Sequence, residues 1–417
     1  MRSPRIAMRN GAGHASRRPC IGIDLHVVDG ILQGSRTHCL ELFSRVIAFT
    51  PECDFVVMAA DPLKLLAFSK CFALPNVTLF PIPKRSASVR LLWQLPQAVR
   101  HCGVSLLHTQ YIAPLVPFCA TAVTVHDILF ESHREYFEKL FVLRSRLLVP
   151  FSARRSAAIF TVSDFSRRQI CDTYSISAEK VHTIPNGVDC ARFFPGDSGR
   201  EIVKDFGLKC SSYFLTVGRL EPRKNHVTLL QAWAQLKVPR PSLVIVGQRH
   251  FLYREAFDLI RTLRLERDVV VLEHVSDIQL PAIYRNAKGF VYCSWAEGFG
   301  ISLLEAMASG IPVVSSTNTA LTEVCGDAAL PVDPSNPSEI LDAIVALDKR
   351  AGLREDLIHR GLLRVKEFTW EKPAQTVRNV YLRHFGLSPS DSPVYSVDDL
   401  PGNDRGSTQI QGELGQH

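Results

Sequence analysis

Short apolar runs alternate with longer amphipathic segments along most of this chain, and this alternation limits its fold more than any other feature. Strands that feed helices and return to a parallel sheet have this pattern, because the strands are buried on both faces and the helices cover them. The expected strands are Cys20–Asp24, Asp54–Ala59, Val104–His108, Ala122–His126 and Ala158–Val162, then Tyr213–Val217, Ser242–Gly247, Val269–Leu272, Gly289–Tyr292 and Pro312–Ser315. The two sets predict an α/β protein with two doubly wound, Rossmann-like domains facing across a cleft.

Composition and spacing suggest the domain boundaries. Pro and Gly gather near 192–199, so we expect an N-terminal domain at 20–193 and a C-terminal domain at 194–368. The closing segment, 369–387, has helical apolar spacing and is expected to cross back to the N-terminal domain.

The two ends of the chain differ from the rest. Residues 1–19 carry five arginines and no acid, and they lack the apolar core of a secretory signal. We expect a disordered basic extension there, with a transit peptide as the alternative. Residues 388–417 are rich in Ser, Pro, Asp, Gly and Gln and bury too little apolar surface to offset the entropy of ordering, which predicts a disordered tail.

Composition also excludes several functional classes. No apolar run reaches the roughly 18 residues that cross a bilayer. The eleven cysteines are scattered without a C-x-x-C pair, which favours a reducing cytosol over a disulfide framework or a zinc cluster. The net charge of +7 is mild, and stacking platforms for nucleic acid are not apparent, so no nucleic acid partner is expected. An NAD oxidoreductase lacks support because no G-x-G-x-x-G turn follows the first strand.

The most informative segment is Cys293–Gly310, which directly follows an expected strand. A doubly wound sheet binds its ligands just outside such strand ends. Gly298 and Gly300 leave room for a ligand at the backbone, and a helix beginning near Ile301 would point its N–H groups and positive dipole end at a phosphate. Gly310 is expected to end that helix.

Two acids lie in this segment, Glu297 in the loop and Glu305 more than one turn into the helix. Carboxylates accept paired hydroxyl donors, so a sugar or a ribose is a suitable ligand. The alternative is an ordinary turn in which Glu305 is a solvated helix residue.

A second segment, Val217–His226, also follows a strand and opens a helix. Pro222 fixes the turn, and Arg219 and Lys224 can clamp a diphosphate, one with a planar fork of donors and the other with a point charge. Surface charges without a ligand are the alternative interpretation.

The acids at 297 and 305, with seven residues between them, resemble the E-x7-E signature of the family 4 retaining glycosyltransferases of the GT-B fold, also called group 1 glycosyltransferases. The match continues through Glu-Ala-Met-Ala-x-Gly-x-Pro-Val-Val, which ends at Val314. Further blocks agree in order: Val125-His126-Asp127, Val162-Ser163-x-Phe165-Ser166, Ile184 to Asp189, Gly218-Arg219 to Lys224-Asn225, Val275 to Tyr284, and Glu323 to Ala328. The likeness covers roughly residues 20–386.

This resemblance implies that the C-terminal domain holds a nucleotide-diphosphate sugar and the N-terminal domain an acceptor. It implies that Arg219 and Lys224 bind the diphosphate, that Glu305 binds the ribose hydroxyls, and that Glu297 binds hydroxyls of the donor sugar. The backbone of Gly298, Phe299, Gly300 and Ile301 would lie against the phosphates. No metal or cofactor is expected, since no acidic D-x-D pair lies where Mg²⁺ would bridge phosphates.

The resemblance also implies roles for four other residues. His126, just after an expected strand, would face the transferred sugar, and Asn186 and Glu323 would contact substrate. Gly34 represents the glycine-rich loop after the first strand, with a helix expected to start near Thr37. This loop has one glycine fewer than in many relatives.

The expected activity is that of a metal-independent hexosyltransferase that retains anomeric configuration. The Val-His-Asp block resembles mannosyl-type transferases of surface polysaccharides and favours GDP-mannose, with a glycan or lipid-linked acceptor. The alternatives are a non-hydrolysing sugar-nucleotide epimerase, a phosphorylase-like GT-B enzyme, and a catalytically silent carbohydrate-binding relative. We expect the protein in the cytoplasm, with peripheral attachment at the inner face of the plasma membrane left open.

Membrane contact is raised by residues 134–168, where eight bases and three acids interleave with leucine, valine and phenylalanine. A basic amphipathic helix of this kind can lie on an anionic membrane surface. We expect instead that its apolar face packs on the core of the N-terminal domain and that its bases face solvent.

Overall fold

The computed structural model describes residues 18–29 and 34–389. The expected basic extension, apart from residues 18 and 19, and the expected tail, apart from residues 388 and 389, lie outside this described part. Residues 30–33 of the expected glycine-rich loop also lie outside it.

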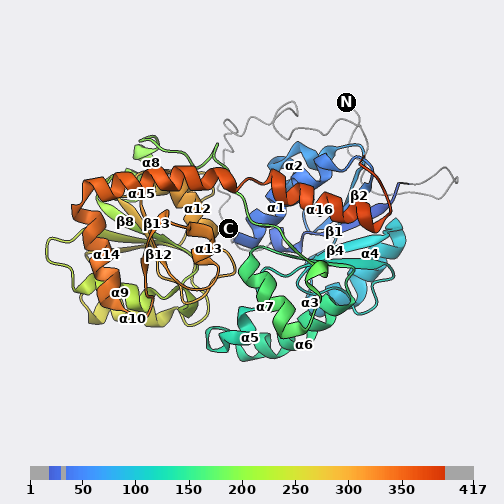
Figure 1. The fold of residues 1–417 in the computed structure, drawn as a ribbon, viewed down its shortest axis with the longest axis horizontal. Helices are drawn as coiled ribbons and strands as arrows, with labels where there is room; N and C mark the ends of the chain where they lie inside the picture. The colour runs from blue at the N-terminus through green and yellow to red at the C-terminus, as the bar shows by residue number, and fades with distance from the viewer. Residues whose placement is uncertain (1–17, 30–33, 390–417) are drawn as a thin grey trace, which may run out of the picture. The chain divides into compact units, whose positions relative to one another are not determined.

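Seven strands form the first sheet, in the order β3-β2-β1-β4-β5-β6-β7, and β1, β2 and β4 are labelled in Figure 1. Their bounds are β1 Cys20–Asp24, β2 Asp54–Ala59, β3 Val77–Pro81, β4 Leu106–Gln110, β5 Ala120–Thr124, β6 Ala158–Thr161 and β7 Val181–Thr183. The first six positions of this order are those of a doubly wound sheet, in which the direction of winding reverses between β1 and β4.

The second sheet has six strands in the order β10-β9-β8-β11-β12-β13, with the reversal between β8 and β11. Their bounds are β8 Tyr213–Val217, β9 Ser242–Val246, β10 Val269–Leu272, β11 Gly289–Tyr292, β12 Val313–Ser316 and β13 Ala329–Val332. The registered pairs are parallel throughout, so the predicted class of two doubly wound α/β sheets is confirmed.

Helices connect the strands. Those up to residue 205 are α1 Gly34–Phe49, α2 Leu63–Phe68, α3 Ala87–Val89, α4 Leu95–Cys102, α5 Leu129–Ser132, α6 Lys139–Arg155, α7 Asp164–Tyr174 and α8 Arg200–Asp205. The later ones are α9 His226–Ala234, α10 Arg254–Thr262, α11 Leu280–Arg285, α12 Ile301–Ala308, α13 Leu321–Cys325, α14 Pro337–Lys349, α15 Ala351–Arg364 and α16 Glu371–His384.

Alternate side chains of the second sheet enter two different cores. Leu215 and Phe290 pack with α11, α12 and α13, whereas their neighbours Phe214 and Val291 pack with α9, α10 and α14. Both faces of the sheet are therefore buried, as the continuous apolar runs of its strands require.

The structure shifts two expected strands by two residues, shifts β12 by one and adds three strands. β4 begins at Leu106 instead of Val104, because the Val104 amide bonds Val99 O and closes helix α4. β4 then continues through the buried polar residues His108 to Gln110. β5 begins and ends two residues before its expected bounds. The added strands β3, β7 and β13 all lie at sheet edges.

Helix α6 contradicts the expectation for its apolar side chains. Its buried face is made of Val142, Ser145, Val149, Pro150, Ser152 and Ala153, whereas most of its leucines and phenylalanines face solvent. Small side chains let the helix lie close against the sheet, and the larger ones have no place in that contact.

The described chain divides into two compact units. One holds the residues up to 109, 114–120 and those from 377 on, and the other holds 110–113 and 121–376. In the first unit, the Tyr381 hydroxyl of α16 lies 2.5 Å from His108 Nδ1, and Arg378 Nη2 donates to Glu52 Oε1 over 2.5 Å. The predicted boundary at residues 193 and 194 stays a prediction.

Candidate active site

The candidate site is built on the loops that follow β8 and β11, on the two sides of the reversal in the second sheet. Ligands of doubly wound sheets bind outside the strands at such a reversal. Asn225 joins the two loops, since its side-chain amide donates to Cys293 O at 2.9 Å and to Pro334 O at 2.7 Å. Its left-handed φ of 57° turns the chain from the Pro222–Lys224 turn into α9.

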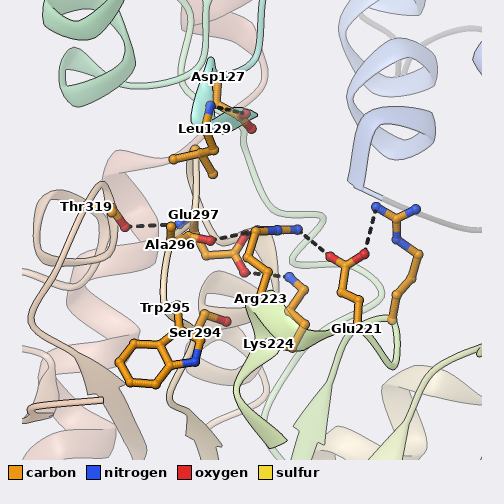
Figure 2. A network of polar contacts seen from close by, with 12 residues as sticks. Asp127, Leu129, Glu221, Arg223, Lys224, Ser294, Trp295, Ala296, Glu297 and Thr319 are labelled. Atoms are coloured by element: carbon orange, nitrogen blue, oxygen red, sulfur yellow. Dashed lines mark hydrogen bonds and ion pairs between the residues drawn. The ribbon is translucent and has the colours of Figure 1, made fainter. Parts of the chain in front are cut away.

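The carboxylate of Glu297 is the centre of a buried polar network (Figure 2). Arg223 Nη1 donates to Glu297 Oε2 at 2.6 Å, and Lys224 Nζ donates to Glu297 Oε1 at 2.6 Å. The Tyr292 hydroxyl also accepts from Lys224 Nζ at 2.6 Å. Thr319 fixes the backbone, because its hydroxyl accepts from the Glu297 amide at 3.0 Å.

Glu221 extends this network to Arg219. Arg223 Nη2 donates to Glu221 Oε1 at 2.7 Å, while Arg219 Nη2 lies 3.4 Å from Glu221 Oε2. Arg219 is 31% exposed, against 12% for Arg223 and Lys224. The three bases and the two acids leave one net positive charge, and the base with the weakest contact is the one most open to an incoming anion.

The two members of the Glu297–Lys224 pair respond differently to burial. Burial alone would raise the pKa of Glu297, but Arg223 and Lys224 outweigh it and lower that pKa to about 2. Burial lowers the pKa of Lys224 more than Glu297 raises it. Glu297 is therefore anionic at neutral pH, and Lys224 would gain from a further anionic partner.

The segment after Glu297 has the predicted helix boundaries. α12 begins at Ile301, Gly300 precedes it with a φ of +98°, and Gly310 follows its end with a φ of +70°. A Cβ on Gly300 would lie 2.7 Å from Leu321 Cδ2. Phe299 is buried against Phe368 with its ring edge-on, so only its backbone is in place to meet a ligand.

Gly298 lies against residues that follow β5 and β6. A Cβ at this position would stand 2.7 Å from Asp127 Cβ, and the Ser163 hydroxyl donates to Gly298 O at 2.7 Å. Burial raises the pKa of Asp127, which Arg223 opposes. A side chain at residue 298 would separate these elements.

Glu305 stands apart from the Glu297 network. Within the part of the chain that the structure describes, its carboxylate accepts from the Tyr284 hydroxyl at 2.9 Å and from no base of the cluster. Burial raises the pKa of Glu305 to about 7, against the hydrogen bond from Tyr284 and the charge of Arg192. The group changes charge near neutral pH.

The remaining predicted residues lie elsewhere. His126 is buried beyond the end of β5, with Nε2 at 2.9 Å from Gln110 Oε1. Asn186 is buried next to Gly187, whose α-carbon faces the backbone of Thr369 and Trp370. Gly34 is the first residue of α1, so the helix begins three residues before its expected start near Thr37.

Glu323 occupies a helix end instead of the Glu297 network. Its two carboxylate oxygens accept from the amides of Asp164 at 2.8 Å and Phe165 at 2.9 Å, at the start of α7. This contact satisfies amides that have no partner inside their own helix.

Sequence reasoning missed Arg223, Glu221 and Tyr292. An arginine on a strand-to-helix loop usually faces solvent, which hid Arg223. The available signal was the local run Glu221-x-Arg223-Lys224, in which two bases exceed one acid and require a further carboxylate if they are buried. No group of His, Cys, Asp or Glu suited to hold a metal ion occurs in residues 18–29 and 34–389.

Comparison with known proteins gives the family. Residues 200–364 match the model for glycosyl transferases group 1, and residues 33–192 match the model for glycosyltransferase family 4. The O-antigen chain mannosyltransferase B of Escherichia coli is 34% identical over 264 residues, which are 62% of this chain and 69% of that protein. The chain belongs to the group 1 glycosyltransferases.

A second relative and a solved structure are also similar to this glycosyltransferase. The O-antigen chain mannosyltransferase RfbU of Salmonella typhimurium is 30% identical over 231 residues, 54% of this chain and 60% of that protein. The sucrose-phosphate synthase from Thermosynechococcus elongatus superposes with a TM-score of 0.70 over 89% of this chain and all of that chain, at 18% identity. The second likeness confirms the GT-B fold of this glycosyltransferase.

Proposed function

We propose that this glycosyltransferase moves a mannosyl residue from GDP-mannose to a glycan or lipid-linked acceptor of a surface polysaccharide, with retention of anomeric configuration. The observation that carries the proposal is the Glu297 carboxylate held by Lys224 and Arg223 at the reversal of the second sheet. Two relatives that are named O-antigen chain mannosyltransferases support mannose as the sugar.

In this proposal, donor binding redistributes the charges of the site. The diphosphate forms an ion pair with Arg219. Lys224 leaves Glu297 and binds the diphosphate as well, while the amides at the start of α12 face the phosphates. Arg223 stays with Glu297, whose oxygens then accept hydroxyls of the sugar. Burial lowers the pKa of Lys224, so its charged form gains from a partner with more negative charge. The diphosphate carries more negative charge than the Glu297 carboxylate, which favours this exchange.

Other residues orient the two substrates. Glu305 accepts the ribose hydroxyls, and His126 faces the transferred sugar. As the bond between C1 and the phosphate oxygen breaks, negative charge grows on the leaving diphosphate, and Arg219, Lys224 and the α12 N-terminus stabilise it. The acceptor oxygen bonds C1 from the same face, and its proton passes to a phosphate oxygen.

The test is a transfer assay with GDP-, UDP- and ADP-sugars and a panel of glycan acceptors. Turnover is expected with GDP-mannose and to fall about a hundredfold each in Arg219→Ala and Lys224→Ala. A rise in KM at constant kcat would instead indicate uniform binding by these bases. Epimerisation or phosphorolysis without transfer, or binding without turnover, would favour the alternative enzymes or the silent relative.

A lipid-linked acceptor would bring the enzyme to the inner face of the plasma membrane. No helix in residues 18–29 and 34–389 is both apolar enough and long enough to pass through a bilayer. In this proposal, such an enzyme reaches its acceptor from the membrane surface.

A further inference from the structure

Helix α6 exposes a row of large apolar side chains. Four of them recur at intervals of three and four residues and therefore share one face of the helix. Their exposed fractions are 77% for Leu140, 61% for Leu143, 64% for Leu147 and 40% for Phe151. We call these four residues the α6 stripe.

The fold does not need the α6 stripe. The helix packs on the first sheet through a different face, where Val142, Val149 and Ala153 join Val123 and Ile159 in one core. Single exposed leucines are common on protein surfaces, but a contiguous apolar row on a helix that already has a buried face marks a binding surface.

Bases flank the α6 stripe on both sides. By helical geometry Arg144 and Arg155 lie along one side, and Lys139 and Arg146 along the other. The Arg155 guanidinium lies 5.0 Å from the centre of the Phe151 ring, which holds its charge beside the apolar row. All four bases are exposed, and α6 itself contains no acid.

Acids near α6, the exposed Glu135 among them, reduce its charge only in part. Glu131 of α5 accepts from Arg146 Nε at 2.7 Å, and the exposed Glu138 immediately precedes the helix. Arg144, Arg154 and Arg155 remain as an excess of positive charge along its length. A protein partner would need a groove of matching shape that is acidic or neutral. A lipid surface needs only anionic groups above an apolar layer, so a lipid surface is the partner that these side chains favour.

We propose that α6 docks this protein on an anionic lipid bilayer, with the α6 stripe at the acyl boundary and its arginines at the lipid phosphates. Helices that lie in a membrane interface combine an apolar face with Lys and Arg along its borders. The 17 residues of α6 span about 25 Å parallel to the surface. This docking goes beyond the proposed sugar transfer and does not depend on it.

The experiment is co-sedimentation of the full chain with vesicles of phosphatidylglycerol and phosphatidylcholine, against vesicles of phosphatidylcholine alone. The wild type is expected to bind the anionic vesicles, and Leu140→Ser with Leu147→Ser to lower that binding at least about tenfold. The matched control is Leu63→Ser with Leu363→Ser, two leucines that are 62% and 50% exposed on other helices and leave binding unchanged.

Charge is tested separately. Arg144→Gln and Arg155→Gln are each expected to weaken binding to the anionic vesicles about fivefold. Thermal unfolding checks that every variant is folded. Equal binding by the stripe variant and the wild type, or binding that ignores lipid charge, would overturn the proposal. So would self-association that the leucine substitutions abolish without any vesicle binding, because a second copy would then cover the stripe.

The vesicle assay contains neither donor nor acceptor. Transfer to a water-soluble acceptor is expected to be unchanged in the leucine and arginine variants. Failure of vesicle binding therefore leaves the proposed transfer reaction untouched, and failure of transfer leaves the docking proposal untouched.

Discussion

Arg223 and Lys224 share the carboxylate of Glu297, and only one of them can leave it when a diphosphate binds. A buried carboxylate that loses both of its basic partners is strongly destabilised, and the Tyr292 hydroxyl, which donates to Glu297 Oε1 at 3.0 Å, carries no charge to replace them. Arg223 is the base that can stay, because it also bonds Glu221 and Ala296 O. We infer that Arg223 is a positioning residue that keeps Glu297 in place and so allows Lys224 to reach the donor.

Arg223→Met is therefore expected to lower kcat/KM by at least about tenfold and to reduce the free energy of unfolding by about 3 kcal/mol. It also raises the pKa of Glu297, so the acid limb of the pH–rate profile moves to higher pH. Arg223→Lys, which keeps one charge, is the control and recovers part of the activity. A loss of stability with an unmoved acid limb would reduce Arg223 to a structural role.

Glu305 gives a second prediction at this scale. If Glu305 accepts the ribose hydroxyls, as proposed, GDP binding requires its ionised form, and burial raises the pKa of this carboxyl to about 7. Affinity in wild type is expected to fall up to about tenfold per pH unit below pH 7, relative to Glu305→Gln. Titration calorimetry at pH 6 and pH 8 measures this, and the variant corrects for protonation of the diphosphate itself. Parallel pH profiles would remove Glu305 from the ribose.

The sequence predicts which loops carry the site because Gly298, Gly300 and Gly310 fix the course of the backbone around α12. It predicts the partners of the charged side chains less well. Arg219 and Lys224 are separated by a turn, and only the folded loop reveals that Lys224 lies on Glu297 while Arg219 lies at the margin. Such pairings depend on distances between two loops that are far apart in the sequence.

At the scale of elements, the strands that the sequence failed to predict are β3, β7 and β13. All three lie at sheet edges, where a strand pairs with another strand on one side only. Fewer residues of such a strand have to be apolar, so the apolar run that marks a strand is weaker. β3 ends at Pro81 and β13 contains Pro331, a residue that sheets accept mainly at their edges. The prediction of the buried face of α6 was wrong for another reason. This helix has apolar residues on two faces, and the sequence does not show which of the two is buried.

Glu323 gives the prediction at this scale. Because its carboxylate caps α7, Glu323→Ala is expected to lower the free energy of unfolding by about 1 kcal/mol. Glu367→Ala, which removes an acid paired with the partly exposed Arg364, should cost less than about 0.5 kcal/mol and serves as the control. Urea unfolding measures both. An increase in donor KM with unchanged stability would instead show that Glu323 contacts the substrate, as the resemblance implies.

At the scale of the molecule, each compact unit buries a histidine that stays neutral. Burial lowers the pKa of His108 in the first unit to about 3 and that of His226 in the second to about 4. In the unfolded chain both would titrate near pH 6.5, so the unfolded state binds more protons below that value. The stability that neutral histidines provide is complete above pH 6.5 and is lost as the pH falls toward 3 or 4.

His108 also joins β4 to α16 through Tyr381, so acid should loosen the C-terminal helix. His108→Gln, which keeps a hydrogen-bonding group without the titration, is expected to weaken the loss of stability between pH 6.5 and pH 4 by on the order of 2 kcal/mol. Hydrogen exchange of the amides of residues 377–384 in α16 at both pH values measures this in the first unit, and amides of α9 beside His226 provide the comparison in the second. If protection of α16 falls equally in variant and wild type, another group drives acid unfolding of the first unit. A change confined to α16 would show that each unit responds to its own histidine.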